Sequence, residues 1–306
     1  HINFAVTLFR HQRIDEGIGV IDSIIAEPQL TANQRYALFV NKGIYAWLRK
    51  DFAALGDCLQ ACTALSDIID RTTIDASLCI YQLYLERLLH HCETNPALYA
   101  GSPSNEIHVI GESHSLSPNG TVVTFEGTPS KIASHLLIGC KAWHLSQPSE
   151  NYFQRGLRSA LSEVPKKGTV IACFGEIDCR HNEGVFHHHR KQGGDLDAII
   201  RKTVEGYVAF VTKATAARNT RLLFTGVPAP HHERPALREF AAEDRTAYLE
   251  AIANFNRQLK EVAEAKGAAV IDVYGLTAGG DGVADGKWHI DHHHLRPDSL
   301  REIFAR

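Results

Sequence analysis

Three residues that could together carry out acyl transfer lie at distant points of the chain. Ser113 follows an apolar run at residues 107–110 and a glycine, whereas Asp291 and His294 stand three residues apart near the carboxyl end. A serine hydroxyl is a weak nucleophile, and it needs a base such as a neutral imidazole within hydrogen-bonding reach. A carboxylate beside the imidazole fixes its tautomer and stabilises the imidazolium. Ser113, His294 and Asp291 therefore have the side-chain chemistry of a nucleophile, a base and an orienting carboxylate.

The residues before Ser113 predict that it stands at the end of a buried strand. Ile107, Val109 and Ile110 fit a short apolar strand, and Gly111 allows a sharp turn where a Cβ would clash. Ligand sites of open α/β sheets form at the carboxyl ends of such strands. An ordinary polar turn after a strand has similar residues, so this motif depends on support from elsewhere in the chain.

A second strand ends in another polar motif. Residues 170–174 form a continuous apolar run, which is typical of a strand that is covered on both faces. The run leads into Gly175-Glu176-Ile177-Asp178. In a parallel sheet, this motif and the Gly111 turn would both lie at the carboxyl edge.

These motifs resemble those of the SGNH, or GDSL-type, hydrolases. Gly111-Glu112-Ser113 resembles the Gly-Asp-Ser block that carries the nucleophile, and Asp291 with His294 resembles the final Asp-x-x-His. The family spacing selects His294 over the neighbouring histidines. The resemblance implies a serine-dependent esterase or O-acyltransferase that acts on an O-acyl group of a small molecule or carbohydrate, with no cofactor and no metal.

The resemblance also implies an oxyanion site, in which this chain departs from the family. The family has Gly-x-Asn-Asp where this chain has Ile177 in place of the asparagine, which removes one side-chain donor. Arg180 could supply the missing donor, oriented by Glu176 or Asp178; alternatively, it pairs with them and only stiffens the loop. The predicted oxyanion and substrate-binding residues are Gly139, Gly175, Glu176, Asp178 and Arg180.

The pattern of apolar residues predicts two domains. Residues 1–98 show helical periodicity over 14–28, 35–50, 51–69 and 73–91, with a rhythm that is similar to tetratricopeptide repeats. Residues 92–104 are rich in proline and serine and predict a linker. Residues 105–306 alternate strands and helices, which predicts a mostly parallel sheet with helices on both faces. The resemblance implies the same fold, a three-layer, flavodoxin-like α/β/α domain of the SGNH type.

Composition restricts the classes of binding partner and the cellular compartment that we expect. The 306 residues carry a net charge of −3 without a basic stripe, which argues against nucleic acid as a partner. The sequence has no apolar run of eighteen residues and no typical signal peptide, and its seven cysteines favour a reducing compartment. We expect a cytoplasmic protein without membrane contact, whose N-terminal helices could bind a protein partner.

Two other functions remain open. The chain has 18 histidines, with runs at 187–189, 231–232 and 292–294, and imidazole is a common metal ligand, so a metal-dependent hydrolase is one alternative. Adjacent histidines point in different directions and cannot all bind one ion, which counts against it. The other alternative is a degenerate SGNH-like domain that binds a ligand, or acts as a scaffold, without catalysis.

Overall fold

The computed structural model describes residues 5, 7–9 and 12–306, and the chain forms two compact units. The helical unit comprises His1–Gly101 with Asn119–Thr121, and the α/β unit comprises Ser102–Pro118 with Val122–Arg306. The sequence placed Asn119–Thr121 with the second domain. They belong to the helical unit because the Asn119 side-chain amide donates a hydrogen bond to the Trp47 carbonyl over 2.7 Å.

The helical unit is built around α3 (Ala32–Arg49), which contacts α2 (Ile14–Ile24), α4 (Phe52–Leu65) and α5 (Ala76–Thr94). Side-chain caps set the starts of these helices: Thr31 and Gln34 form a capping box, and Asp51 and Asp75 accept backbone N–H groups. The predicted linker is wrong at its start, because α5 continues to Thr94 and a 3-10 turn, η1 (Pro96–Leu98), follows. The resemblance to tetratricopeptide repeats stays a prediction.

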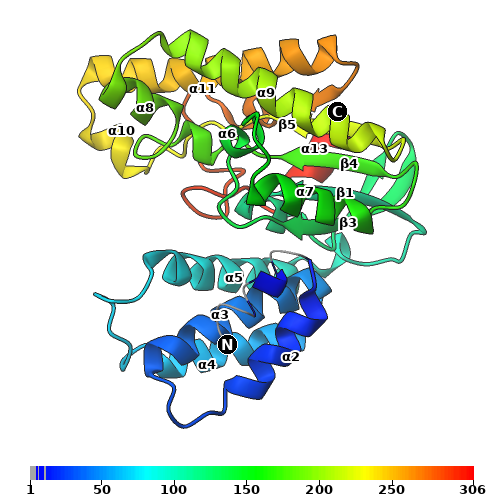
Figure 1. Ribbon diagram of the computed structural model, residues 1–306, viewed down its shortest axis with the longest axis vertical. Coiled ribbons are helices and arrows are strands. Elements are labelled where there is room, and N and C mark those ends of the chain that lie inside the picture. The colour runs from blue at the N-terminus through cyan, green and yellow to red at the C-terminus, as the bar shows by residue number, and fades with distance from the viewer. Residues whose placement is uncertain (1–4, 6, 10–11) are drawn as a thin grey trace. The chain divides into compact units, whose positions relative to one another are not determined.

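A six-stranded sheet forms the centre of the α/β unit (Figure 1). Its spatial order is β2-β3-β1-β4-β5-β6, and every neighbouring pair is parallel except β2 and β3. The antiparallel pair is joined by Glu126-Gly127, both with positive φ, as tight hairpins require. The strands are β1 (Asn105–Gly111), β2 (Val122–Phe125), β3 (Thr128–Leu136), β4 (Thr169–Cys173), β5 (Arg221–Thr225) and β6 (Ala269–Ile271).

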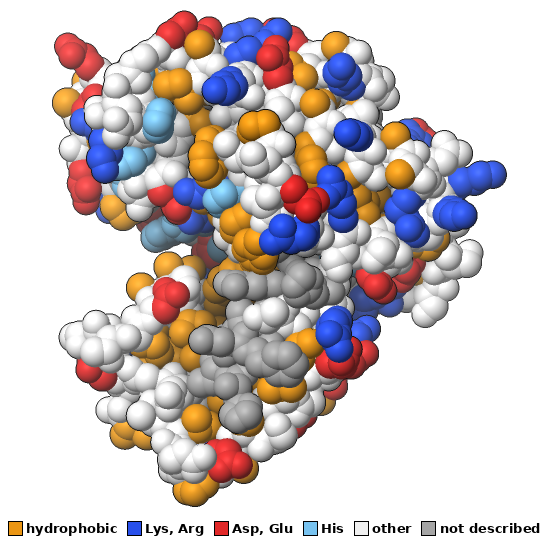
Figure 2. Space-filling view, viewed as in Figure 1, with side chains coloured by type: hydrophobic (Ala, Val, Ile, Leu, Met, Phe, Trp, Pro, Cys, Tyr) orange, Lys and Arg blue, Asp and Glu red, His pale blue; other side chains and the backbone are white. Residues whose placement is uncertain are grey.

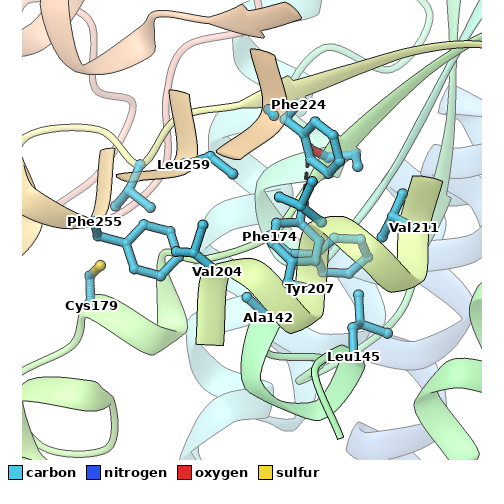
Figure 3. Packing of buried hydrophobic residues seen from close by; sticks show 14 of the residues in the cluster. Ala142, Leu145, Phe174, Cys179, Val204, Tyr207, Val211, Phe224, Phe255 and Leu259 are labelled. Atoms are coloured by element: carbon cyan, nitrogen blue, oxygen red, sulfur yellow. Dashed lines mark hydrogen bonds between the residues drawn. The ribbon is translucent and has the colours of Figure 1, made fainter. Parts of the chain in front are cut away.

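Two apolar cores cover the two faces of this sheet, so the expected three-layer α/β/α architecture is confirmed. The larger core packs one face against helices that include α9 (Leu196–Ala216) and α11 (Ala242–Ala265), and Tyr207 lies there between Phe174 and Phe224 (Figure 3). The smaller core packs the other face against α12 (Val273–Thr277) and α13 (Ser299–Ala305). The remaining helices are α6 (Ala142–Leu145), α7 (Tyr152–Glu163), α8 (Val185–Gln192) and α10 (Pro235–Glu239).

The last strand, β6, ends at Ile271, because the Asp272 side chain accepts the Gly275 N–H and caps α12. Among the described residues, we find no helix that is both long and apolar enough to span a membrane.

Candidate active site

Ser113 begins a 3-10 turn, η2 (Ser113–Leu116), at the carboxyl end of β1. A Cβ on Gly111 would lie 2.3 Å from the Cys173 carbonyl of the neighbouring strand β4, so only glycine permits this close approach. The backbone N–H of Glu112 donates a hydrogen bond to the same Cys173 carbonyl. The close contact between the two strand ends holds the Ser113 turn next to the loop that follows β4.

His294 lies between Ser113 and Asp291. Its Nε2 is 2.9 Å from Ser113 Oγ, and its Nδ1 is 2.8 Å from Asp291 Oδ2. The other oxygen of Asp291 accepts the backbone N–H groups of His293 and His294, both at 2.7 Å. Burial raises the pKa of Asp291, but the charge and hydrogen bonds of His294 outweigh it and hold that pKa well below its ordinary value. Asp291 is therefore an ionised carboxylate that fixes the imidazole.

The neighbouring histidines have other contacts. His292 Nε2 lies 3.2 Å from a Glu233 carboxylate oxygen, and His293 Nδ1 lies 2.9 Å from an Arg234 nitrogen. Ser115 donates its hydroxyl hydrogen to the Glu112 carbonyl. The structure thus brings together the three residues that the sequence selected for catalysis.

Glu112 is a second acceptor for the Ser113 hydroxyl. This almost fully buried carboxylate lies 2.8 Å from Ser113 Oγ through Oε2, and its other oxygen lies 2.9 Å from His114 Nδ1. His114 Nε2 in turn donates to the His293 carbonyl. Burial opposes both charges, but the two groups stabilise each other: the pKa of Glu112 is lowered and that of His114 is raised to about 9. Glu112 and His114 therefore form a buried ion pair.

Ser113 Oγ lies within hydrogen-bonding distance of both Glu112 and His294, but the hydroxyl has only one hydrogen to donate. One of these two partners must therefore carry an additional proton. If the hydroxyl donates to ionised Glu112, then His294 must carry a hydrogen on Nε2 to face the oxygen. If the hydroxyl donates to His294, then Glu112 must be protonated. Only the second arrangement leaves His294 free to accept the serine proton, so the protonation of Glu112 bears directly on the reactivity of Ser113.

A buried cluster of charges lies beside the Ser113 turn. Glu176 is paired with Arg180 at 2.8 Å and with Arg234 at 2.5 Å, and the two guanidinium groups hold its pKa well below the ordinary value although burial opposes this. Arg234 also donates to the His292 carbonyl and to the Tyr248 hydroxyl. Arg234 thereby ties the loop that carries Asp291 and His294 to the loop that follows β4.

The predicted oxyanion and substrate-binding residues have mixed surroundings. Ile177 is buried in η3 (Ile177–Cys179) and offers no side-chain donor. Both carboxylate oxygens of Asp178 accept N–H groups at the start of α6, at 2.7 and 2.9 Å, so we assign this residue a positioning role rather than substrate binding. Arg180 is bound by Glu176 and by Glu183 at 3.1 Å. These contacts fit the alternative in which Arg180 pairs with nearby carboxylates and stiffens the loop. They also orient its guanidinium.

The two predicted glycines both have positive φ. Gly175, at +121°, could not carry a Cβ without meeting the Phe255 ring at 2.8 Å, so this residue shapes the loop after β4. Gly139, at +69°, is exposed in the turn after β3 and has open space around it. Its N–H stays a predicted oxyanion donor.

A small cavity of about 40 Å³ adjoins the turn η2. Its lining includes Glu112 and His114 together with the apolar residues Phe174, Leu295 and Leu300. A space of this size holds only a few water molecules.

Sequence reasoning missed three residues of this site. Glu112 stands at the family's aspartate position, and His114 follows the nucleophile directly, so both were within a recognised motif. Arg234 had no such signal, since it follows a histidine pair in a proline-rich segment. Among the described residues, His231, Glu233 and His292 also form a group that could hold a metal ion.

Comparison of the sequence with family models and with curated proteins gives no match. Solved structures with a similar fold include an extracellular lipase from Streptomyces rimosus (15% identity, 66% of this chain and 99% of that one, TM-score 0.42). Another is the acetyl xylan esterase AlAXEase (17% identity, 65% of this chain and 96% of that one, TM-score 0.41). A third is phospholipase A1 from Streptomyces albidoflavus NA297 (13% identity, 67% of this chain and 99% of that one, TM-score 0.41). These likenesses are too distant to indicate a function.

Proposed function

We propose that the α/β unit is a serine-dependent esterase or O-acyltransferase of the SGNH type. The observation that carries this proposal is the position of His294, whose two ring nitrogens face Ser113 Oγ at 2.9 Å and Asp291 at 2.8 Å. This is the arrangement of nucleophile, base and orienting carboxylate that acyl transfer requires.

The proposed reaction proceeds through an acyl-enzyme. In the arrangement with Glu112 protonated, Ser113 Oγ attacks the acyl carbon while His294 Nε2 takes the hydroxyl proton, and Asp291 stabilises the imidazolium. The tetrahedral intermediate collapses, the bond to the alcohol oxygen breaks, and His294 returns the proton to that oxygen. Water or an acceptor alcohol then attacks the acyl-enzyme, with His294 again as the base. Attack by water is hydrolysis, and attack by an alcohol is acyl transfer.

The oxyanion site is the weakest part of this machinery. We assign it the backbone N–H groups of Ser113 and Gly139, whereas Ile177 adds nothing. One missing donor typically costs about 10²–10³ in kcat. Arg180 is the proposed compensating group, because its charge is near enough to influence the pKa of Glu112 beside the nucleophile.

We propose an O-acyl group on a small molecule or carbohydrate as the substrate. Binding of a protein partner by the helical unit is a separate proposal, supported by the exposed apolar side chains of Ile80 on α5 and Ile68.

Covalent labelling tests the proposed nucleophile. The whole chain is treated with a fluorophosphonate probe, and the modified peptide is identified by mass spectrometry. We expect one label, on Ser113, which Ser113→Ala and His294→Gln abolish while circular dichroism stays unchanged. Ser115→Ala is the matched control, two residues away, and should still be labelled. Labelling of a folded Ser113→Ala variant at an unchanged rate would refute the serine mechanism.

A degenerate domain that only binds a ligand is the second candidate. Two observations favour it: Ile177 lacks the oxyanion donor, and Glu112 competes for the Ser113 hydroxyl proton. A folded wild-type chain that reacts neither with the probe nor with p-nitrophenyl acetate would support this candidate over the enzyme.

A further inference from the structure

We propose that His231, Glu233 and His292 form a binding site for a divalent transition metal such as Zn²⁺. Each residue offers one ligand atom, and these atoms all lie within 4.8 Å of one another. The site lies outside the proposed reacting groups. In our proposal it joins the segment before α10 to the loop that carries Asp291 and His294.

The distances are close to those of a coordination sphere. Zinc binds histidine nitrogen and carboxylate oxygen at about 2.0–2.2 Å, which places two tetrahedral ligand atoms about 3.3 Å apart. Glu233 Oε2 and His292 Nε2 are already 3.2 Å apart. Both side chains are about half exposed, so they can rotate toward His231, which is held in a buried position.

The histidine chemistry suits metal binding. The Glu233 N–H donates to His231 Nδ1 at 3.1 Å, which identifies Nδ1 as a nitrogen with a lone pair. A metal bound there would replace this one hydrogen bond.

A third histidine lies beside the group. The His289 ring is 5.4 Å from the His231 ring. Its Nδ1 is buried and has no hydrogen-bond partner among the described residues. An unpartnered buried nitrogen is costly, and a metal, or a water molecule bound to one, would satisfy it.

The donor set indicates the class of ion. Two imidazoles and one carboxylate favour zinc, cobalt, nickel or iron over calcium and magnesium, which prefer oxygen ligands alone. Histidine side chains are visible on one face of the α/β unit (Figure 2). Within the part of the chain that the structure describes, the histidine run on α8 forms no such group with a carboxylate.

Bound metal would act on the loop rather than on the substrate. His292 lies between Asp291 and His294 in the chain, and Arg234 already holds the His292 carbonyl at 3.0 Å. Coordination of the His292 side chain would fix the same residue a second time. We therefore expect the loop to exchange amide hydrogens more slowly when metal is bound.

The test uses the whole chain, freed of metal with a chelator. Zn²⁺ binding is measured by calorimetry, and Co²⁺ binding by its visible absorption, which reports coordination geometry. We expect one tight site per chain. Outer-shell mutations at metal sites typically cost 10–100-fold in affinity, so loss of a ligand in His292→Ala or Glu233→Gln should cost about 100-fold or more.

His188→Ala is the matched control, because His188 is exposed in the histidine run of α8 and far from this group in sequence. It should bind metal as tightly as the wild type. Equal binding in wild type, His292→Ala and Glu233→Gln, or equal loss in His188→Ala, would overturn the site. Hydrogen exchange over 288–294 gives an independent readout, and the expected slowing with Zn²⁺ should be absent in Glu233→Gln.

Failure of this site is distinguishable from failure of the proposed function. Fluorophosphonate labelling of Ser113 in the metal-free chain reports the nucleophile alone, and we expect it to survive chelation. Loss of labelling on chelation, with recovery on addition of Zn²⁺, would instead place the metal in the reaction and overturn its assignment as a loop clamp.

Discussion

Replacing Arg234 by methionine should destabilise the α/β unit and disorder the loop that carries the proposed base. The guanidinium is buried, and it contacts Glu176 at 2.5 Å, the His292 carbonyl at 3.0 Å and the Tyr248 hydroxyl at 3.2 Å. Methionine fills a similar volume but leaves these acceptors without their donor. The perturbation therefore removes charge and hydrogen bonds with little change in packing.

The size of the effect follows from the partners that remain. Removing one member of a buried ion pair typically costs about 3–5 kcal/mol, because the other charge is left uncompensated. Glu176 keeps Arg180 at 2.8 Å, which offsets part of this cost. Three further contacts are lost, to the His292 carbonyl, the Tyr248 hydroxyl and His293 Nδ1, each worth about 1 kcal/mol. We expect the free energy of unfolding to fall by about 3–5 kcal/mol in total.

Urea unfolding, followed by tryptophan fluorescence and by circular dichroism, measures this loss. Arg238→Met is the matched control, because Arg238 is exposed on α10, and it should change stability by less than about 0.5 kcal/mol. The double variant Arg234→Met with Glu176→Gln should be more stable than additivity predicts, since the uncompensated carboxylate is gone.

A fall in the free energy of unfolding of less than about 1 kcal/mol in Arg234→Met would refute the reasoning, because removing a fully paired buried guanidinium should cost more stability than this. The functional readout is the rate at which Ser113 reacts with a fluorophosphonate. We expect about a tenfold slower reaction, since small displacements of a base have large effects on rate. An unchanged rate in a destabilised variant would show that Arg234 supports the fold without positioning His294.

Three other predictions concern the groups around Ser113. Glu112→Gln supplies a permanent N–H donor to Ser113 Oγ and leaves the hydroxyl free to donate to His294. Probe labelling of Ser113 at pH 7 should therefore be faster. Slower labelling would mean that the carboxylate assists the reaction. The folded pKa of His114, about 9, lies above its ordinary 6.5, so its contribution to stability is complete below pH 6.5 and is lost as pH rises through 9. Urea titrations from pH 6 to 10 should show this loss in the wild type and not in His114→Gln. Ile177→Asn restores the amide of the family motif, and a rise in kcat of up to about 10² is expected; an unchanged kcat for p-nitrophenyl acetate would mean that another group already supplies the donor.

Local sequence was sufficient to predict the strand before Gly111, the turn that follows it, and the pairing of Asp291 with His294 in the proposed triad. An apolar run followed by Gly111 specifies a strand that ends in a tight turn, because the backbone and a missing Cβ decide that geometry. Asp291 and His294 are three residues apart, so one loop turn brings their side chains together. The mostly parallel sheet also followed from sequence, since strands that alternate with long helices leave few other arrangements.

The electrostatic environment of Ser113 was decided by tertiary structure. Glu176 and Arg234 are 58 residues apart, and no local pattern pairs a buried carboxylate with one arginine rather than another. The same holds for Asp178, whose carboxylate accepts the N–H groups of Ala142 and Trp143, about 35 residues earlier in the chain. Buried charges find partners wherever the fold brings opposite charges together, because desolvation makes an unpaired charge too costly. Sequence could therefore name the proposed reacting groups, whereas their protonation and support depended on contacts that only the folded chain creates.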